Sequence, residues 1–406
     1  MPALILRQHT LMKLVKKLLL ALSLALASAA YPVDWSGNLA IEARVFPSAA
    51  QWPKQRNGDL SLSFQPELRH RWNDDKRGLT FIPFFRVDSM DEERTHADIR
   101  ELKYLHVADG WELHAGIDKV FWGVTESQHL VDIVNQTDLI EDIDGEDKLG
   151  QPMVRVTKIL GNGAIDLFLL PWFRERTFAG VEGRLRTPLV VDTDRARYES
   201  DAEERHLDYA LRWSRTMGAV DVALSWFQGT ARAPGLVPDT RGGEPILVPY
   251  YPLLRQAGLE FQYTGEAWLW KLEAVHRNTE GKGYRAAVGG FEYTFVGVSD
   301  SPLDLGLLAE YNYDSRRRDA SSPYQNDLFT GTRLTFNDTQ STEVLVGGIF
   351  DLDYHSRSFR LDASRRIGQS YKLSVEGQIF SDMASRDPLS TFAADDFIRI
   401  DLTYYF

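Results

Sequence analysis

Hydrophobic and polar residues alternate along most of this chain with a period of two. In one clear segment Leu60, Leu62 and Phe64 share one parity, while Ser61 and Ser63 share the other. Such alternation places the two sets of side chains on opposite faces of a β-strand. The sequence therefore predicts a succession of amphipathic strands.

Turn signals divide these segments from one another. The short connections, such as 73–77 and 217–218, contain Gly, Asn or Asp, which suit tight hairpins. Longer connections, such as 120–151 and 174–204, lie between them. We expect strands to begin near residues 37, 59, 78, 97, 111, 152, 164, 205, 219, 255, 267, 284, 303, 326, 342, 355, 371 and 396.

This layout predicts an all-β fold. Transmembrane barrels have an even number of antiparallel strands, short periplasmic turns and long extracellular loops. We therefore expect a closed antiparallel transmembrane β-barrel of about 18 strands, or 16 if two weak segments are misread. The alternation of short and long connections then places both termini in the periplasm.

Composition and charge support a barrel over a soluble sandwich. The 406 residues include no Cys and carry a formal net charge of −12, which gives no support for nucleic-acid binding. The polar parity of the strands carries many charges that would be costly in a dry core but not in a water-filled lumen. These residues are Arg69, Arg86, Asp166, Asp208, Arg212, Glu273, Arg333, Glu376 and Arg399.

The first residues have the layout of an export signal. Lys13, Lys16 and Lys17 precede a short apolar run, and Ala27-Ser28-Ala29 fits a small-residue cleavage site. We expect a signal peptide at 1–29 and a barrel at 30–406, with either Met1 or Met12 as the start. Export of a chain of this kind predicts a location in the bacterial outer membrane.

The last strand carries a second signal. Ile400, Leu402, Tyr404 and Phe406 share one face, and the chain stops at Phe406. A final strand with a terminal Phe resembles the signal by which outer-membrane proteins are recognised by the barrel-assembly machinery. The resemblance implies that Tyr404 and Phe406 contact that machinery. The alternative is an ordinary edge strand of a soluble β protein.

The connection at 120–150 is too long for a simple hairpin. Gly116, Trp122, Gly123, Asn135 and Asp138 follow a pattern of Gly, spacer, Trp-Gly and an Asn-Pro-x-Asp-like turn. The chain here resembles proteobacterial porin-like barrels that are distantly similar to alginate-export and phosphate-selective porins. Gln136 and Thr137 replace the Pro-containing part of that turn. The resemblance implies a loop that folds inward and narrows a channel.

Such a loop would bring acidic residues to a constriction. We expect Asp138, Glu141, Asp142 and Asp144 to face inward arginines across a water-filled gap. Opposed charges set a transverse field that sorts solutes by charge and dipole. Two alternatives stay open: a solvated extracellular loop, and a site for calcium, which prefers oxygen ligands. The arginines expected at the constriction are Arg69, Arg86, Arg100 and Arg155.

The remaining candidates concern partners and enzyme chemistry. Arg316, Arg317 and Arg318 fall in a predicted outer loop, where guanidinium groups could bind lipopolysaccharide phosphates or simply be solvated. None of the nine His residues has a recognisable metal-site spacing, so we predict no metal, no cofactor and no enzyme. The expected function is a porin-like channel for passive diffusion of small hydrophilic or amphipathic solutes; the alternative is an adhesion, assembly or hydrolase barrel.

Overall fold

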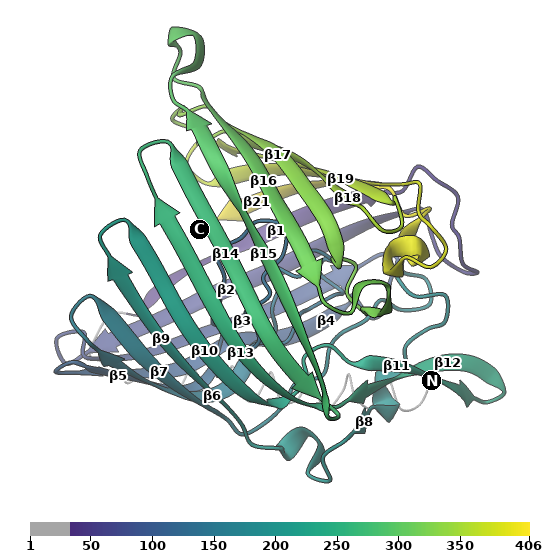
Figure 1. Cartoon of the computed structure of the whole chain (residues 1–406), viewed down its shortest axis with the longest axis horizontal. Coiled ribbons are helices and arrows are strands. Elements are labelled where there is room, and N and C mark those ends of the chain that lie inside the picture. The colour runs from purple at the N-terminus through teal and green to yellow at the C-terminus, as the bar shows by residue number, and fades with distance from the viewer. Residues whose placement is uncertain (1–32) are drawn as a thin grey trace.

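The computed structural model describes residues 33–406, so the predicted signal peptide at 1–29 lies outside the described residues. Eighteen strands form one closed antiparallel barrel (Figure 1). β1 pairs with β2 on one side and with the last strand, β21, on the other, which closes the wall. The predicted fold class is confirmed, and every wall strand begins within three residues of its expected start.

The wall strands follow one another around the barrel in chain order. They are β1 (Asp34–Val45), β2 (Gly58–Trp72), β3 (Arg77–Asp88), β4 (His96–Ala108), β5 (Trp111–Asp118), β6 (Gln151–Ile159), β7 (Gly163–Leu170), β9 (Asp208–Met217), β10 (Val220–Thr230), β13 (Leu253–Thr264), β14 (Trp268–Thr279), β15 (Lys282–Phe295), β16 (Asp304–Asp314), β17 (Asn326–Thr335), β18 (Glu343–Asp351), β19 (Arg357–Ile367), β20 (Tyr371–Ser381) and β21 (Phe397–Tyr405).

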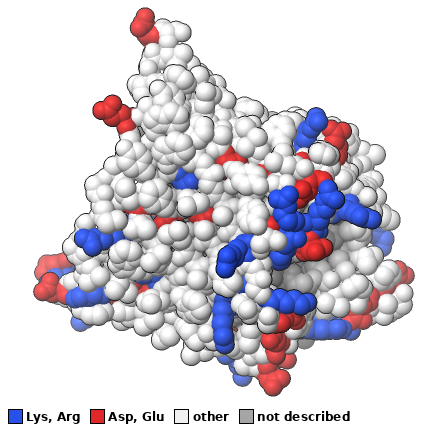
Figure 2. Space-filling model, in the orientation of Figure 1, with Lys and Arg blue, Asp and Glu red and all other residues white. Residues whose placement is uncertain are grey.

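The two faces of the wall have the expected polarity. Leu60 and Leu62 are exposed on the outside, whereas the intervening Ser61 and Ser63 are buried on the inside. The whole apolar parity of β21, from Ile398 to Phe406, is likewise exposed. Figure 2 shows a largely uncharged wall with charged side chains gathered mainly near its edges. An apolar exterior around a polar interior is the arrangement of a transmembrane barrel.

The closing seam involves the last residue of the chain. Gly37 and Phe406 exchange two backbone hydrogen bonds of 3.2 Å each. The Phe406 ring stacks against Trp35 and Phe64, with centroid distances of 6.0 and 6.2 Å. The first described strand and the last residue therefore lie on one rim. The side of the membrane that this rim faces remains a prediction.

Most long connections lie at one rim and most short ones at the other, apart from the short turn 280–281 and the eight-residue connection 296–303. One long connection, 231–252, contains β11 (Gly235–Arg241) and β12 (Glu244–Tyr251), which form a small sheet with β8 (Arg197–Tyr198) from another. The alternation pattern did not predict this sheet, because its strands are short and interrupted by prolines. The 3-10 helices are η1 (Thr193–Arg195), η2 (Glu203–Arg205), η3 (Val298–Asp300), η4 (Arg317–Asp319) and η5 (Pro388–Phe392).

Helices play little part in the described fold. Within residues 33–406, no helix has the length and apolar character needed to cross a membrane.

The two faces of β18 provide a test of the fold. Val346 is 47% exposed on the outer wall, and its neighbour Leu345 lines a cavity inside the barrel. We expect Val346→Arg to lower the free energy of unfolding in lipid by about 2–4 kcal/mol, because the charge enters hydrocarbon. Leu345→Arg should cost much less, because its charge enters water. Urea titration of the barrel in vesicles measures both, and equal losses would contradict the assigned faces.

Candidate functional site: a loop across the barrel lumen

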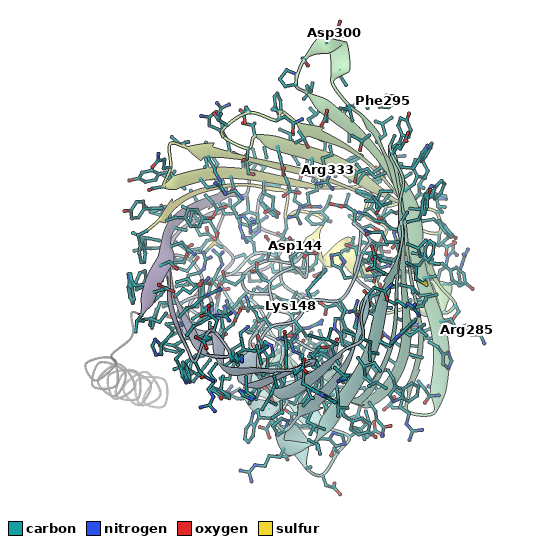
Figure 3. All side chains as sticks on the ribbon, turned by 90° about the vertical axis from the view of Figure 1, so that its left-hand side faces the viewer. Asp144, Lys148, Arg285, Phe295, Asp300 and Arg333 are labelled. Atoms are coloured by element: carbon teal, nitrogen blue, oxygen red, sulfur yellow. The ribbon has the colours of Figure 1, made fainter. Side chains whose placement is uncertain are left out.

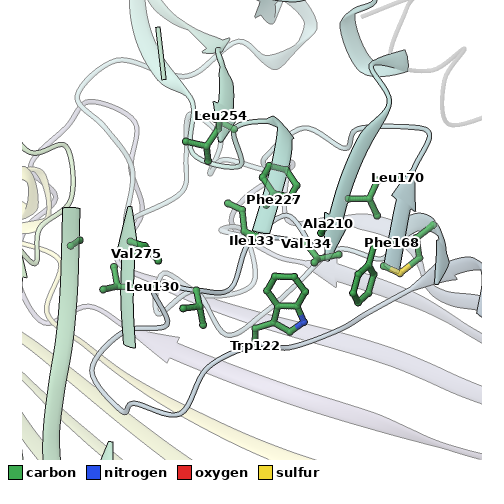
Figure 4. Close-up of a cluster of buried hydrophobic side chains, with 14 of the residues drawn as sticks. Trp122, Leu130, Ile133, Val134, Phe168, Leu170, Ala210, Phe227, Leu254 and Val275 are labelled. Carbon is green, nitrogen blue, oxygen red and sulfur yellow. The ribbon is translucent and has the colours of Figure 1, made fainter. Parts of the chain in front are cut away.

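Residues 119–150, here called the inner loop, connect β5 to β6 and lie inside the barrel. Trp122, Val131 and Val134 are buried against inward side chains of the wall, including Phe168 on β7 and Phe227 on β10 (Figure 4). Val131, Val134 and Phe227 are fully buried. A transmembrane barrel normally has a polar interior, so this apolar patch exists where the loop covers it.

Two wall carboxylates hold the backbone of the inner loop. Glu273 on β14 accepts hydrogen bonds from the N–H groups of Val124 and Thr125, at 2.7 and 3.1 Å. Glu310 on β16 accepts those of Glu126 and Ser127, both at 2.8 Å. Irregular backbone away from bulk water needs such partners. The two glutamates therefore replace the hydrogen bonds that a strand or helix would supply.

Two arginines do the same for the loop carbonyl groups, one just after the end of β10 and one on the wall strand β14. Arg232 donates from Nε and Nη2 to the carbonyl oxygen of Val134, at 3.1 and 3.0 Å. Arg277 on β14 donates to the carbonyl oxygen of Leu130 at 2.7 Å. Donors and acceptors of one loop segment are thus paired with charged groups of the wall. Charge-assisted hydrogen bonds of this kind are stronger than neutral ones.

The acidic part of the loop contacts the opposite arc of the wall. Asp138 lies 2.6 Å from Arg100 on β4, and Glu141 lies 2.7 Å from Arg86 on β3. Both carboxylates are buried, with 0% and 6% exposure. These are direct ion pairs rather than charges facing each other across a water-filled gap. The pairing neutralises the charges and fixes the loop to the wall.

Two further acids of the loop pair with arginines that the sequence analysis did not assign to the constriction. Asp142 pairs with Arg399 on β21, and Asp144 lies 2.9 Å from Arg360 on β19. The inward parity of Arg399 was recognisable in the sequence. Its contact with the loop was not, because more than 250 residues separate the partners.

Arg69 and Arg155 do not contact the inner-loop acids within residues 33–406. Arg69 pairs with Glu67 and lies opposite Asp34, near the rim of short turns. Arg155 lies 3.8 Å from Asp118, at the end of β5. The inward parity of Arg69 and Arg155 is compatible with many depths along the strand, so alternation alone could not place them at the loop.

The lumen beside the loop stays open along β17–β21. A cavity of about 340 Å³ there is lined by residues that include Arg333, Lys372, Glu343 and Asp362. Figure 3 looks into the barrel and shows Asp144, Lys148 and Arg333 pointing towards its centre, while Phe295 and Arg285 lie at its periphery. Arg333 also reaches Glu126 of the loop, at 2.8 Å. The remaining passage is therefore bordered by charges of both signs.

The residues Arg316, Arg317 and Arg318 lie in the connection between β16 and β17. Arg316 pairs with Asp314 at 2.6 Å, and its guanidinium carbon lies 3.6 Å from the centroid of the Tyr284 ring. Arg317 lies 3.1 Å from Asp353. Arg316 and Arg317 are thus already paired with carboxylates of this chain. Binding of the three arginines to lipopolysaccharide stays a prediction.

Comparisons with known proteins find only distant likenesses to solved structures. No protein-family model matches it, and no curated protein matches it. OmpTΔL8, a loop deletion mutant of OmpT, an outer membrane protein of Vibrio cholerae, has 11% identity and a TM-score of 0.49, over 93% of this chain and 100% of that chain. A mutant of the Rh. blastica porin has 11% identity and a TM-score of 0.46, over 92% and 100%.

The likenesses to these solved structures are too weak to carry an argument about mechanism or solute. The assignment of the chain to the class of transmembrane β-barrels rests on the strand pairing and on the polarity of the two faces of the wall. The chain is a closed transmembrane β-barrel of 18 strands with porin-like architecture, and a loop crosses its lumen.

Glu273 offers a test of how the loop is held. We expect Glu273→Gln to weaken the loop anchorage by about 1–3 kcal/mol, because hydrogen bonds to a charged acceptor are lost. Hydrogen exchange at residues 124–131 should then accelerate. Glu260→Gln is the matched control, since Glu260 is a buried wall glutamate on β13 that pairs with Arg212 instead of the loop. Unchanged exchange in Glu273→Gln would contradict this role.

His129 should make the anchorage depend on pH. Burial lowers the pKa of His129, but the hydrogen bond to Glu146 and the carboxylate of Glu273, 3.8 Å away, outweigh that effect and raise the pKa from 6.5 to about 10. The stabilisation from charged His129 is therefore complete below about pH 6.5 and is lost as the pH rises through about 10. We expect proteolysis of the loop to increase over that range, and to lose this dependence in His129→Gln. A flat wild-type profile would refute the assignment.

Proposed function

We propose that this protein is an outer-membrane channel for passive diffusion of small hydrophilic or amphipathic solutes. The observation that supports the proposal is the inner loop, which crosses the lumen of an 18-strand barrel and leaves a charged cavity beside β17–β21. A barrel of this strand number has room for an aqueous path rather than a packed interior. The loop then sets the narrowest point of that path.

The proposed mechanism involves no bond chemistry. A solute enters from one rim, exchanges part of its hydration for the charged groups at the loop, and leaves by the other rim. Arg333 and Lys372 line the cavity together with Glu343, Asp362 and Asp401. Opposite charges on the walls of one narrow passage favour solutes that can orient a dipole between them. Purely apolar solutes gain nothing from such a passage.

The ion pairs of the loop have a specific part in this mechanism. Asp138, Glu141, Asp142 and Asp144 each neutralise an arginine of the wall. Each arginine also pairs with a carboxylate of the wall, so removing the loop acids would leave its positive charge less fully compensated. The acids therefore set both the position of the loop and the charge of the passage.

The proposal includes an orientation and partners. The rim of short turns would face the periplasm, as in other barrels of the outer membrane. Tyr404 and Phe406, at the closing seam, would be recognised by the barrel-assembly machinery before the seam forms. The rim of long connections, which includes Arg316 to Arg318, would then face lipopolysaccharide. Cleavage of residues 1–29 would precede assembly.

Ion selectivity tests the proposed constriction. We expect the variant with Asp138→Asn, Glu141→Gln, Asp142→Asn and Asp144→Asn to shift towards anion selectivity, because four negative charges leave the lumen and each of four arginines loses one of its carboxylate partners. The reversal potential in planar bilayers under a salt gradient measures the shift, which should shrink at high salt through screening.

The matched control changes net charge equally outside the lumen. It replaces four exposed acids of the outer connections, Asp201, Glu203, Glu280 and Asp319, by their amides. The control should keep the reversal potential of the parent protein. If the inner-loop variant also keeps it at low salt, the loop lies outside the permeation path and the proposed constriction is wrong.

A further inference from the structure

Three potential metal-ligating side chains meet where the inner loop contacts β4. They are His96, the first residue of β4, and Asp138 and Glu141 of the loop. One ligand atom from each lies within 4.8 Å of the other two. Asp138 and Glu141 are buried, and His96 is half-buried towards the lumen. Among the described residues, these are the only such group of three.

The tautomer of His96 is fixed by its backbone contact. Its Nδ1 lies 3.0 Å from the carbonyl oxygen of Arg94, which can only accept a hydrogen bond. Nδ1 therefore carries the hydrogen, and the neutral ring presents the lone pair of Nε2. That lone pair faces Oε1 of Glu141 at 3.5 Å. Both atoms are buried and have no hydrogen-bond partner.

Two facing acceptors repel each other unless a cation lies between them. A proton shared by nitrogen and carboxylate gives a separation of about 2.7–2.9 Å. Zinc binds histidine nitrogen and carboxylate oxygen at about 2.0–2.2 Å, so two ligands of a tetrahedral ion lie about 3.4 Å apart. The separation of 3.5 Å between His96 and Glu141 fits the metal-bound geometry better than the hydrogen bond.

The surrounding charges also favour a bound cation. Glu141 belongs to one connected group of ion pairs that contains four carboxylates and three guanidinium groups. The group therefore has one more negative charge than positive charges. A buried surplus of negative charge is costly. The members of this group are Glu42, Asp59, Asp88, Glu141, Arg44, Arg86 and Arg94.

The neighbouring arginines leave the ligand atoms available. Arg86 bonds Oε2 of Glu141 and also contacts Glu42 and Ser61, so Oε1 of Glu141 remains free. Arg100 bonds Oδ2 of Asp138 and also contacts Asp98, and Oδ1 of Asp138 accepts a hydrogen bond from the Thr177 hydroxyl at 2.7 Å. A carboxylate can accept about four contacts. Each acid can therefore bind a metal and keep its arginine.

We propose that His96, Asp138 and Glu141 form a binding site for a divalent transition-metal ion of the zinc class. The mixed nitrogen and oxygen ligands suit zinc better than calcium, which prefers oxygen alone. Lumen water would supply the fourth ligand. One ligand comes from the wall and two from the loop, so the ion fastens the loop to β4. The site shares Asp138 and Glu141 with the proposed constriction, but binding of the ion does not require that the barrel conducts solutes.

The test uses the full-length barrel in detergent micelles and Zn²⁺ alone as the probe. Isothermal titration should show one Zn²⁺ per barrel, with affinity reduced about tenfold or more in His96→Asn and in Glu141→Gln. His114→Asn is the matched control. His114 lies 3.6 Å from Glu112 and 3.7 Å from Asp118, on the adjacent strand β5, without forming a group of three ligands.

A second measurement does not depend on the folding of any variant. Co²⁺ bound to the wild-type barrel should give the intense visible absorption of a four-coordinate site, and Zn²⁺ should displace it. The proposal would be overturned if the wild-type barrel does not bind one Zn²⁺ per molecule. It would also be overturned if added Co²⁺ shows only the weak spectrum of the hydrated ion. Loss of binding in His114→Asn equal to that in His96→Asn would also overturn it, because the ion would then lie elsewhere.

Discussion

Charged side chains of the wall hold the inner loop, and the shape of the lumen depends on this contact. A loop inside a barrel brings polar backbone and carboxylates away from bulk water, where each unpaired group is costly. Glu273 and Glu310 satisfy its N–H groups, and Arg232 and Arg277 satisfy its carbonyls. Buried charged groups thus supply the hydrogen bonds that the irregular loop cannot make within itself.

Two different forces act on the two arcs of the wall. Along β7–β14 the loop packs through apolar side chains, and the free-energy gain is that of removing apolar surface from water. Along β3, β4, β19 and β21 it is held by ion pairs. β17–β21 border an open cavity, because there the loop makes few contacts with the wall beyond Arg333, Arg360 and Arg399. The position of the passage follows from this unequal distribution of contacts.

Sequence reasoning located part of the site. Long-loop length and acidic content indicated residues 120–150, and inward parity indicated Arg86 and Arg100, which do contact the loop. Arg69 and Arg155 share that parity but lie at other depths. The cluster of His96, Asp138 and Glu141 had no signal in the sequence. Asp138 and Glu141 follow His96 by 42 and 45 positions, and this spacing is not characteristic of a metal site.

The sequence by itself indicated about 18 wall strands, their starts to within three residues and the face of most of their side chains. These are local properties, since a two-residue period and a turn signal act within one hairpin. Only the tertiary structure decided which charges meet. Asp142 and Arg399, or Thr125 and Glu273, come together because closing the barrel brings distant strands to one lumen. The physical reason is that parity fixes direction, whereas depth and partner depend on strand tilt, register around the whole wall and the path of the loop.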